Sequence, residues 1–368
     1  MENMTRRLLI DAHEDLAFMS IYDGFDYTRS TAENRRNHSG PSTFQCMVGR
    51  PELVKAGAAV IFGTIFSYPK EKKDAYTKNG VNTYETAEDF HRAVLAQLDF
   101  YDRLSGEHPE HFRRIFSRAD LDQILEAWEK DQESAPPTGL VGLMEGAEGL
   151  RSFDDLELYY ERGIRLIGPV WGGGRWCAGT FSRDFPDALT DDGKKLLRAM
   201  SGRGFVLDVS HMQNRSAMDA LDYYDGIAVA THANCKALLK GISGERHLND
   251  ETIRMLIEHD GVMGVIPYNS FLYPGWKEDG SMPRELVTMN TLADHVDHIC
   301  QLAGHSRAAA IGTDADGGFG FPDIPYEMND ISGIQILAEK LADRGFSDED
   351  IDNVFHKNWQ RILERALK

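Results

Sequence analysis

The stretch "LLIDAHED" (residues 8–15) places a short apolar run directly before a cluster of ionisable side chains. Such a run is typical of a strand that is buried on both faces. The residues that follow it, among them His13 and Asp15, are costly to bury unless they are paired or bound to a metal. The end of this strand is therefore a candidate functional site, and the rest of the chain indicates the fold that holds it.

The same arrangement recurs along the chain. Eight apolar runs end in polar or glycine-rich residues, and a helical pattern usually follows; they cover residues 8–15, 58–66, 139–147, 163–171, 204–211, 227–234, 261–269 and 308–316. Strands that alternate with helices indicate parallel βα units. Eight such units predict an α/β protein with a (β/α)8 TIM barrel. A doubly wound sheet is the alternative, but no GxGxxG follows the first run.

We expect residues 1–368 to form one barrel domain with two insertions, at about 17–57 and 67–138, after the first and second strands. The second insertion carries two helical patterns, at 86–104 and 119–132. Long excursions after barrel strands usually shape the mouth of an active site. Residues 248–261 predict a helix with Asn249 or Asp250 as its N-cap, and the last twenty or so residues predict a closing helix on the outside.

Composition excludes several classes of partner. The chain has 40 Lys and Arg against 59 Asp and Glu, a net charge of −19, and no basic block, which argues against nucleic acid and anionic membranes. Its four cysteines are scattered without a CxxC pair, so we expect reduced thiols. The first apolar run is too short for a signal peptide and no stretch is long enough for a membrane span, so we expect a cytoplasmic protein.

Polar side chains gather at the ends of these runs, where barrel enzymes carry their catalytic groups. The acidic and imidazole side chains at run ends that we take as candidates are His13, Asp15, Glu145, His211, His232 and Asp314. Residues two apart on a strand face the same side, so His13 and Asp15 point together. Imidazole and carboxylate are zinc ligands, and the five such groups other than Asp314 exceed the three that one catalytic zinc takes. The pattern therefore predicts two metal ions that share a carboxylate.

A single histidine at a strand end is more often hydrogen-bonded than metal-bound. The other ten histidines, however, lie off the strand ends, and only these three join acidic residues there. Asp314, at the end of the last run, is placed as a general base. We expect Asp316 to serve the turn before Gly317, Glu14 to point away from the ligands, and Asp11 to be a supporting partner of them.

Six motifs carry a resemblance to a known family: "DAHEDL", "MEGAEG", "LDVSH", "ATHANCKAL", "RHLNDETIR" and "IGTDADG". In order and spacing they resemble the membrane (renal) dipeptidase family, peptidase M19, of the amidohydrolase-type barrels. The resemblance implies one zinc ion on His13, Asp15 and Glu145. It implies that Glu145 bridges to a second ion on His211 and His232. It also implies that Asp314 moves protons, that Arg246 binds the free carboxylate of a dipeptide, and that Tyr268 lines the substrate pocket.

Two departures from the family stand out. Where the well-known dipeptidases have a substrate-contacting histidine after the fourth strand, this chain has Trp171, in "WGGGRW" (171–176). "EGAEG" (145–149) replaces the usual "EGGH". We expect Trp171 and Trp176 to form walls of the substrate site. The chain resembles the divergent bacterial branch of the family, which implies a homodimer.

The function expected from these residues is a zinc-dependent dipeptidase that uses a hydroxide between the two metals and tolerates a C-terminal D-residue. One alternative is a binuclear amidohydrolase acting on another amide, an N-acyl amino acid, a lactone or an ester. The fourth run does not end in a lysine, and the first ends in His-x-Asp rather than His-x-His, which disfavours two other branches of such barrels. A third possibility is a barrel that binds a metal or ligand without catalysis.

Overall fold

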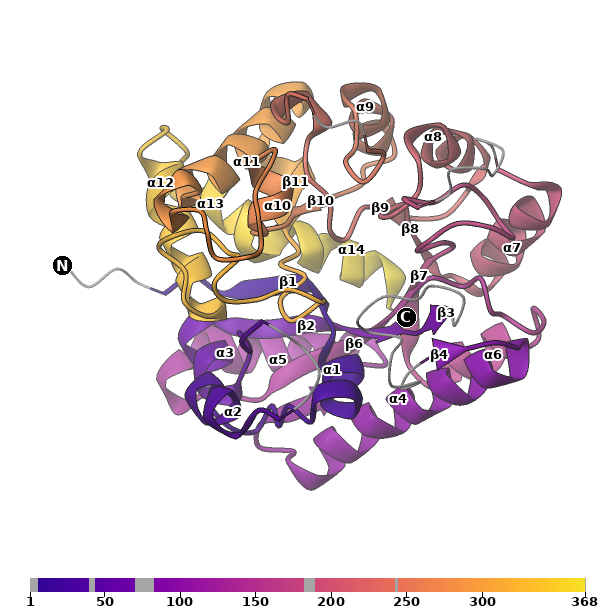
Figure 1. Ribbon diagram of the computed structural model, residues 1–368. Coiled ribbons are helices and arrows are strands. Elements are labelled where there is room, and N and C mark those ends of the chain that lie inside the picture. Colours follow the sequence, from indigo (N-terminus) through magenta and orange to yellow (C-terminus); the bar gives the residue numbers. More distant parts are fainter. Residues whose placement is uncertain (1–5, 40–43, 70–82, 182–188, 242–243, 368) are drawn as a thin grey trace.

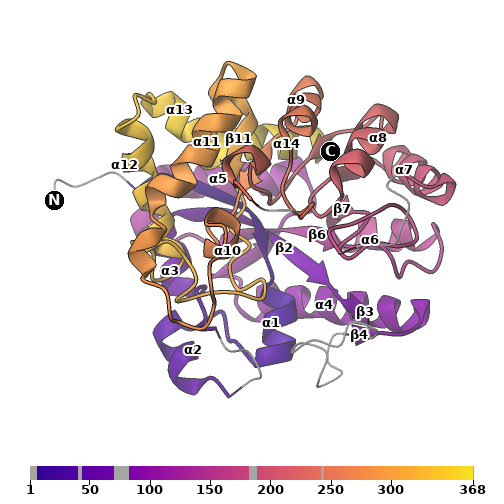
Figure 2. The same ribbon diagram turned by 45° about the horizontal axis from the view of Figure 1, so that its top comes forward.

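The computed structural model describes residues 6–39, 44–69, 83–181, 189–241 and 244–367. Within them, eight parallel strands form the centre of the molecule and helices surround it (Figures 1 and 2). The strands are β1 (Leu9–Glu14), β2 (Ala58–Phe66), β6 (Thr138–Glu145), β7 (Ile164–Gly168), β8 (Val206–Asp208), β9 (Ala228–Val229), β10 (Met263–Val265) and β11 (Ala309–Ile311). Each lies within one of the eight apolar runs of the sequence, except that β6 begins one residue before its run.

The strands close into a ring in their sequence order. Six of them pair continuously in the order β1-β2-β6-β7-β8-β9, and β10 pairs with β11. Parallel bridges from Ala230 to Met263 and from Ala315 to Glu14 join these two parts. The closure is tight near Thr231, because a Cβ on Gly312 would lie 1.8 Å from the Thr231 carbonyl oxygen. The predicted (β/α)8 barrel is confirmed.

A helix follows every strand of the ring before the next strand begins, as expected for βα units. The helices are α1 (Leu16–Asp23), α2 (Thr31–Asn37), α3 (Arg50–Ala56), α4 (Ala87–Glu107), α5 (Arg118–Lys130), α6 (Asp155–Glu161), α7 (Asp191–Arg203), α8 (Asn214–Tyr223), α9 (Asp250–Glu258), α10 (Asn269–Leu272), α11 (Met289–Ala303), α12 (Ile336–Ala342), α13 (Asp348–Asp352) and α14 (Asn358–Ala366). Short 3-10 turns lie at Gln132–Ser134, Lys236–Leu238, Arg284–Leu286, Ser306–Ala308 and Ile331–Gln335. The predicted N-cap of α9 is confirmed at Asn249, whose side chain accepts the backbone N–H of Thr252.

The closing helix at the C-terminal end is interrupted rather than continuous. A π-helical turn at Asn353–Lys357 separates α13 from α14. The break lets Asn358 donate to the carbonyl oxygens of Ser306 and Ala309, while the Trp359 indole N–H donates to Ile311. These bonds hold α14 against the end of β11, where it covers the apolar side chains of β1 and β2.

The two long segments after β1 and β2 carry secondary structure of their own. Helices α1, α2 and α3 lie in residues 17–57, apart from the first residue of α1. Residues 67–138 hold α4, α5 and the short strands β3 (Tyr68–Pro69), β4 (Thr83–Tyr84) and β5 (Phe112–Arg114). Residues 40–43 and 70–82 of these segments lie outside the described residues.

Two further expectations can be compared with the structure. All four cysteines are buried and free. No helix in the described ranges combines the length and the apolar character that crossing a membrane requires.

Candidate metal centre

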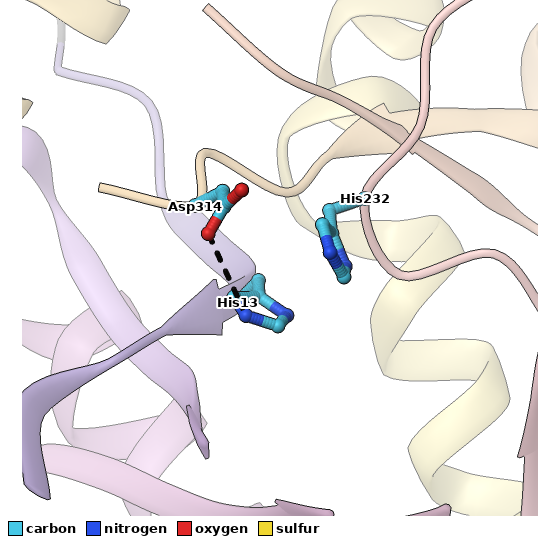
Figure 3. Close-up of side chains that lie close together, drawn as sticks. All are labelled: His13, His232 and Asp314. Carbon is cyan, nitrogen blue, oxygen red and sulfur yellow. Dashed lines mark ion pairs between the residues drawn. The ribbon is translucent and has the colours of Figure 1, made fainter. Parts of the chain in front are cut away.

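The six acidic and imidazole residues predicted from the run ends meet at the carboxyl end of the barrel. His13 lies in β1, Asp15 directly follows it, and Glu145 is the last residue of β6. His211, His232 and Asp314 each come three residues after a strand: β8, β9 and β11. All six side chains are buried. Figure 3 shows three of them, His13, His232 and Asp314, turned toward a common space from separate elements.

His13 faces three carboxylates without bonding to any of them. Its Nε2 atom lies 3.5 Å from Asp15, 3.6 Å from Asp314 and 3.7 Å from Glu145, measured to the nearest carboxylate oxygen. The side chain is fully buried, and neither ring nitrogen has a hydrogen-bond partner in the described residues. A buried polar atom without a partner is costly, so this convergence fits a set of ligands arranged around a cation.

Glu145 connects this group to a pair of histidines. Its Oε2 atom faces His13, while Oε1 lies 2.9 Å from Nε2 of His211 and 3.2 Å from Nε2 of His232. The ligand atoms of His13, Asp15 and Glu145 lie within 4.8 Å of one another, and so do those of Glu145, His211 and His232. The donor set is nitrogen and oxygen only, which suits zinc, and Glu145 belongs to both groups.

A hydrogen-bonded chain behind His232 sets the orientation of its ring. The Thr231 hydroxyl lies 2.5 Å from Oδ2 of Asp208 and 2.9 Å from Nδ1 of His232. Because the hydroxyl donates to the carboxylate, it can accept from Nδ1–H of His232. This leaves the Nε2 lone pair of His232 turned toward Glu145, as a metal ligand requires. Asp208 and Thr231 are functional candidates that the sequence did not single out.

The backbone is strained at the same end of the barrel. Among the described residues other than glycine, five have a positive φ, and three of them are His211 (63°), Asp314 (55°) and Asp316 (63°). This left-handed conformation is unfavourable for residues with a Cβ and is concentrated at functional sites. The left-handed conformation directs the side chains of His211 and Asp314 toward the metal centre. Strand periodicity does not predict this direction.

Burial shifts the pKa values of the ionisable groups at this centre. Burial raises the pKa of Asp314 to about 7, with a further upward contribution from Asp15 and an opposing one from His13. Burial likewise raises the pKa of Glu145 well above its ordinary range. The pKa of His232 is lowered, first by burial and then by His13. So many ionisable groups in one buried volume indicate that a cation completes the site.

Arg246 brings unpaired donors to the edge of this centre. Its side chain is buried, and one guanidinium nitrogen donates to the carbonyl oxygen of His232 at 3.1 Å. The other two nitrogens, Nε and Nη2, have no partner within the described residues. The guanidinium carbon lies 5.0 Å from the centre of the Phe271 ring. A carboxylate ligand would satisfy both free nitrogens, since guanidinium matches the two oxygens of a carboxylate.

A cavity of about 330 Å³ opens over the centre. Asp15, Glu145, His211, Asp314 and Arg246 line it, and so do Trp171 and Tyr268. Its remaining walls are mainly aromatic: Phe18, Phe66, Tyr68, Phe181, Phe271 and Phe319. The apolar walls with a few polar groups at one end are typical of a small-molecule site.

One sequence expectation about the walls is wrong, and one about the turns is incomplete. Trp176 does not line the cavity; it is fully buried and its indole N–H donates to the Ala147 carbonyl oxygen. Asp316 does more than serve a turn. Its carboxylate is buried and accepts the backbone N–H groups of Met47 (2.7 Å) and Val48 (3.3 Å). It therefore fastens the segment between α2 and α3 to the mouth of the barrel.

Asp11 and Glu14 lie beside the centre but in none of its groups of possible metal ligands. Asp11 accepts from the backbone N–H and the hydroxyl of Thr313, at 2.8 and 2.6 Å, and its contact to His13 is to the backbone N–H at 3.4 Å. It ties β1 to the end of β11 and does not reach the His13 ring nitrogens. Glu14 is fully buried, with Thr313 as its hydroxyl partner.

Comparisons of the sequence with known proteins point to one family. The family model for membrane dipeptidase, peptidase family M19, matches residues 2–368. A protein of Klebsiella pneumoniae, described as an uncharacterized protein in the pqqA 5' region, is 30% identical over 280 residues, covering 73% of this chain and 94% of that protein. Dipeptidase aclJ of Aspergillus oryzae is 24% identical over 369 residues, covering 98% of this chain and 78% of that protein.

Solved structures share the barrel. A metallopeptidase of Rhodobacter sphaeroides, liganded with a phosphinate mimic of the dipeptide L-Ala-D-Ala, matches with a TM-score of 0.77 at 23% identity over 98% of this chain and 100% of that chain. The dipeptidase AC, described as a metallopeptidase of family M19, matches with a TM-score of 0.76 at 23% identity over 99% of both chains. At such identities the likeness establishes the fold.

Proposed function

Because the chain belongs to the membrane dipeptidase family, peptidase family M19, and is thus a metallo-dipeptidase, we propose that it hydrolyses the peptide bond of dipeptides with two zinc ions. The observation that carries this proposal is the position of Glu145. One of its oxygens faces His13 and the other faces the Nε2 atoms of His211 and His232. A carboxylate between two groups of nitrogen and oxygen donors suits a shared ligand of two ions.

In this proposal His13, Asp15 and Glu145 hold one ion, and Glu145, His211 and His232 hold the other. The unpartnered ring nitrogens of His13 and the all-nitrogen-and-oxygen donor set support it. When bound, such ions lower the pKa of a water toward neutrality and polarise the carbonyl oxygen of an amide. The chain's other residues then have to place the peptide and move the protons.

Asp314 is the proposed proton carrier. Its carboxylate lines the cavity beside His13. It forms a third group of possible ligand atoms with His13 and His232, but neither of the two groups that share Glu145 includes it. Oδ1 of Asp314 would take the proton of the attacking water and pass it to the nitrogen of the leaving amino acid as the C–N bond breaks. A carboxyl whose pKa is raised toward neutrality suits both halves of this transfer.

Arg246 is the proposed anchor for the free carboxylate of the substrate. Its two unpartnered nitrogens would each donate to one carboxylate oxygen, which restricts the site to peptides that end one residue beyond the scissile bond. Binding through the carboxylate leaves the configuration at the adjacent carbon less constrained. We extend to this chain a tolerance for a C-terminal D-residue, supported by the L-Ala-D-Ala mimic bound to the Rhodobacter sphaeroides relative.

A cytoplasmic location and a homodimer belong to the proposal as well. Four buried free thiols are compatible with a reducing compartment. The dimer rests on the family resemblance alone, and sedimentation analysis of the purified protein tests it.

A substrate comparison with the zinc-loaded protein tests the activity. We expect hydrolysis of L,L- and L,D-dipeptides, and little hydrolysis of the same dipeptides carrying a C-terminal amide. N-acyl amino acids, lactones and phosphoesters are assayed in the same comparison as the alternative substrate classes. Faster turnover of any of those three classes than of every dipeptide would overturn the proposed substrate class.

A further inference from the structure

The two positions at which this chain departs from its family are joined by hydrogen bonds. One carboxylate oxygen of Glu148 accepts the backbone N–H groups of Trp171 (2.8 Å), Gly172 (3.0 Å) and Gly173 (3.4 Å). The loop is glycine-rich, with φ of 113° at Gly173 and 143° at Gly174, so it has little conformational preference of its own. Glu148 therefore fixes the backbone from which Trp171 projects.

The fixed Trp171 side chain belongs to a cluster of aromatic rings on one wall of the cavity. Ring centres lie 4.8 Å away at Tyr68, 4.8 Å at Phe181 and 5.2 Å at Phe66. Phe18 extends the cluster, with its ring 5.3 Å from that of Phe66. Phe181 is 54% exposed although it faces the cavity, which leaves apolar surface that a ligand can cover.

This aromatic wall lies across the barrel from Arg246. In the order of the eight-stranded ring, β2 is opposite β9, and β7 is opposite β11. The wall is built from β2 and the segments after β1, β2 and β7, whereas Arg246 follows β9. A second, smaller aromatic group adjoins Arg246, with Phe271 beneath its guanidinium and Tyr268 stacked on Phe319 at 3.9 Å.

A dipeptide anchored by its carboxylate at Arg246 thus has its N-terminal residue on the far side of the metal centre, against the aromatic wall. We infer that the enzyme selects dipeptides whose N-terminal residue carries a large apolar, above all aromatic, side chain, and that Glu148 is the positioning residue that holds Trp171 for this selection. The inference rests on the proposed function. It follows from packing: an aromatic side chain against several rings gains both apolar burial and ring contacts.

A matrix of dipeptides tests the selection directly on the unmodified, zinc-loaded protein. kcat/KM is measured for Phe-Ala, Trp-Ala, Leu-Ala, Ala-Ala, Lys-Ala and Asp-Ala, and for Ala-Phe and Ala-Leu. We expect Phe-Ala and Trp-Ala to exceed Ala-Ala by about 10-fold or more, in line with apolar pockets. Inhibition by phosphinate mimics of Phe-Ala and Ala-Ala gives an independent measure of the same preference without turnover.

The results distinguish a failure of the proposed function from a failure of the inferred substrate selection. Absence of hydrolysis of every dipeptide would remove the proposed function and this inference with it. Hydrolysis of all N-terminal residues at similar kcat/KM, or a preference set by the C-terminal residue instead, would overturn only the inference.

Variants then assign the preference to Trp171 and Glu148. Trp171→Ala and Glu148→Ala should lower the ratio of kcat/KM for Phe-Ala to kcat/KM for Ala-Ala about 10-fold, mainly through the KM of Phe-Ala. Trp171→Phe should restore much of the preference. Phe116→Ala and Glu157→Gln alter an exposed ring and an acidic residue of α6 away from the cavity and serve as controls. Equal losses for Phe-Ala and Ala-Ala in the Glu148 variant would contradict its positioning role.

Discussion

The Nε2 atoms of His211 and His232 lie 2.9 Å apart, facing each other across the end of the barrel. Neutral imidazole carries one donor and one acceptor nitrogen, so a direct bond between these atoms uses one donor only. His232 is already supplied with a partner for its other nitrogen through Thr231. The Nε2 lone pair of His232 is therefore available to a metal ion. His211 offers its own Nε2 lone pair when its proton is on Nδ1, which lies 3.4 Å from the Thr180 hydroxyl.

If Glu145 is shared by two ions as proposed, removing its carboxylate should release both. We predict that Glu145→Gln lowers the metal content below one ion per chain and reduces dipeptide hydrolysis by more than about 100-fold, since even partners outside the ligand set change metal sites by 10- to 100-fold. Elemental analysis and kinetics check this. Glu14→Gln is the matched control, a buried glutamate on β1 that belongs to none of the ligand groups. Equal metal loss in both variants would contradict the assignment of Glu145.

The support for His232 gives a second prediction. Thr231→Val removes the hydroxyl between Asp208 and His232 while keeping the shape of the side chain. We expect the zinc affinity, measured by competition with a chromophoric chelator, to fall about 10- to 100-fold. Thr64→Val is the control, because the buried Thr64 hydroxyl has no hydrogen-bond partner among the described residues. An unchanged zinc affinity in Thr231→Val would exclude Thr231 as the support of His232.

We expect Arg246 to bind the free carboxylate of the dipeptide. Hydrogen bonds to charged groups contribute about 1.5–3 kcal/mol each, so loss of two of them predicts a fall in kcat/KM of about 100-fold or more for Arg246→Met. The fall should be seen with a free dipeptide and be nearly absent with the corresponding dipeptide amide. A parallel decline on both substrates would show that Arg246 acts on the centre as a whole.

His295, a buried histidine outside the metal centre, should make the free energy of unfolding depend on pH. His295 accepts the backbone N–H of Cys235 at 3.0 Å, and burial lowers its pKa from 6.5 to about 3. Below pH 6.5 the unfolded chain binds a proton at this residue and the folded chain does not. The free energy of unfolding therefore falls as the pH drops from about 6.5 to about 3, by about 1.4 kcal/mol per pH unit.

Urea titrations of His295→Gln at several pH values check this contribution. Between pH 6 and about 4, the free energy of unfolding of the variant should fall less steeply with decreasing pH than that of the original protein, by up to about 1.4 kcal/mol per pH unit. This difference in slope does not depend on the stability of the variant at neutral pH. His108→Gln replaces a histidine on the surface and should keep the slope of the original protein. A slope in His295→Gln identical to that of His108→Gln would contradict the prediction.

The sequence predicted the barrel and the six residues at its strand ends, because strand periodicity and strand order determine which residues reach the carboxyl end. It did not predict features that depend on loop geometry. The left-handed backbone at His211 and Asp314, the bonds from Glu148 to the Trp171 loop and the fastening of Met47 by Asp316 all require the folded arrangement. Likewise, Asp208 and Thr231 read as ordinary strand-end residues until His232 is placed beside them.

The zinc content of the purified protein, determined together with dipeptide hydrolysis while metal is removed and returned, decides whether the chain is a dipeptidase with two zinc ions. We expect two zinc ions per chain, loss of hydrolysis when a chelator removes them, and recovery as zinc is added back toward two equivalents. Zinc bound to the folded state should also raise the midpoint of thermal unfolding. Full hydrolysis by protein shown to be free of metal, or full activity with one ion per chain, would contradict this expectation.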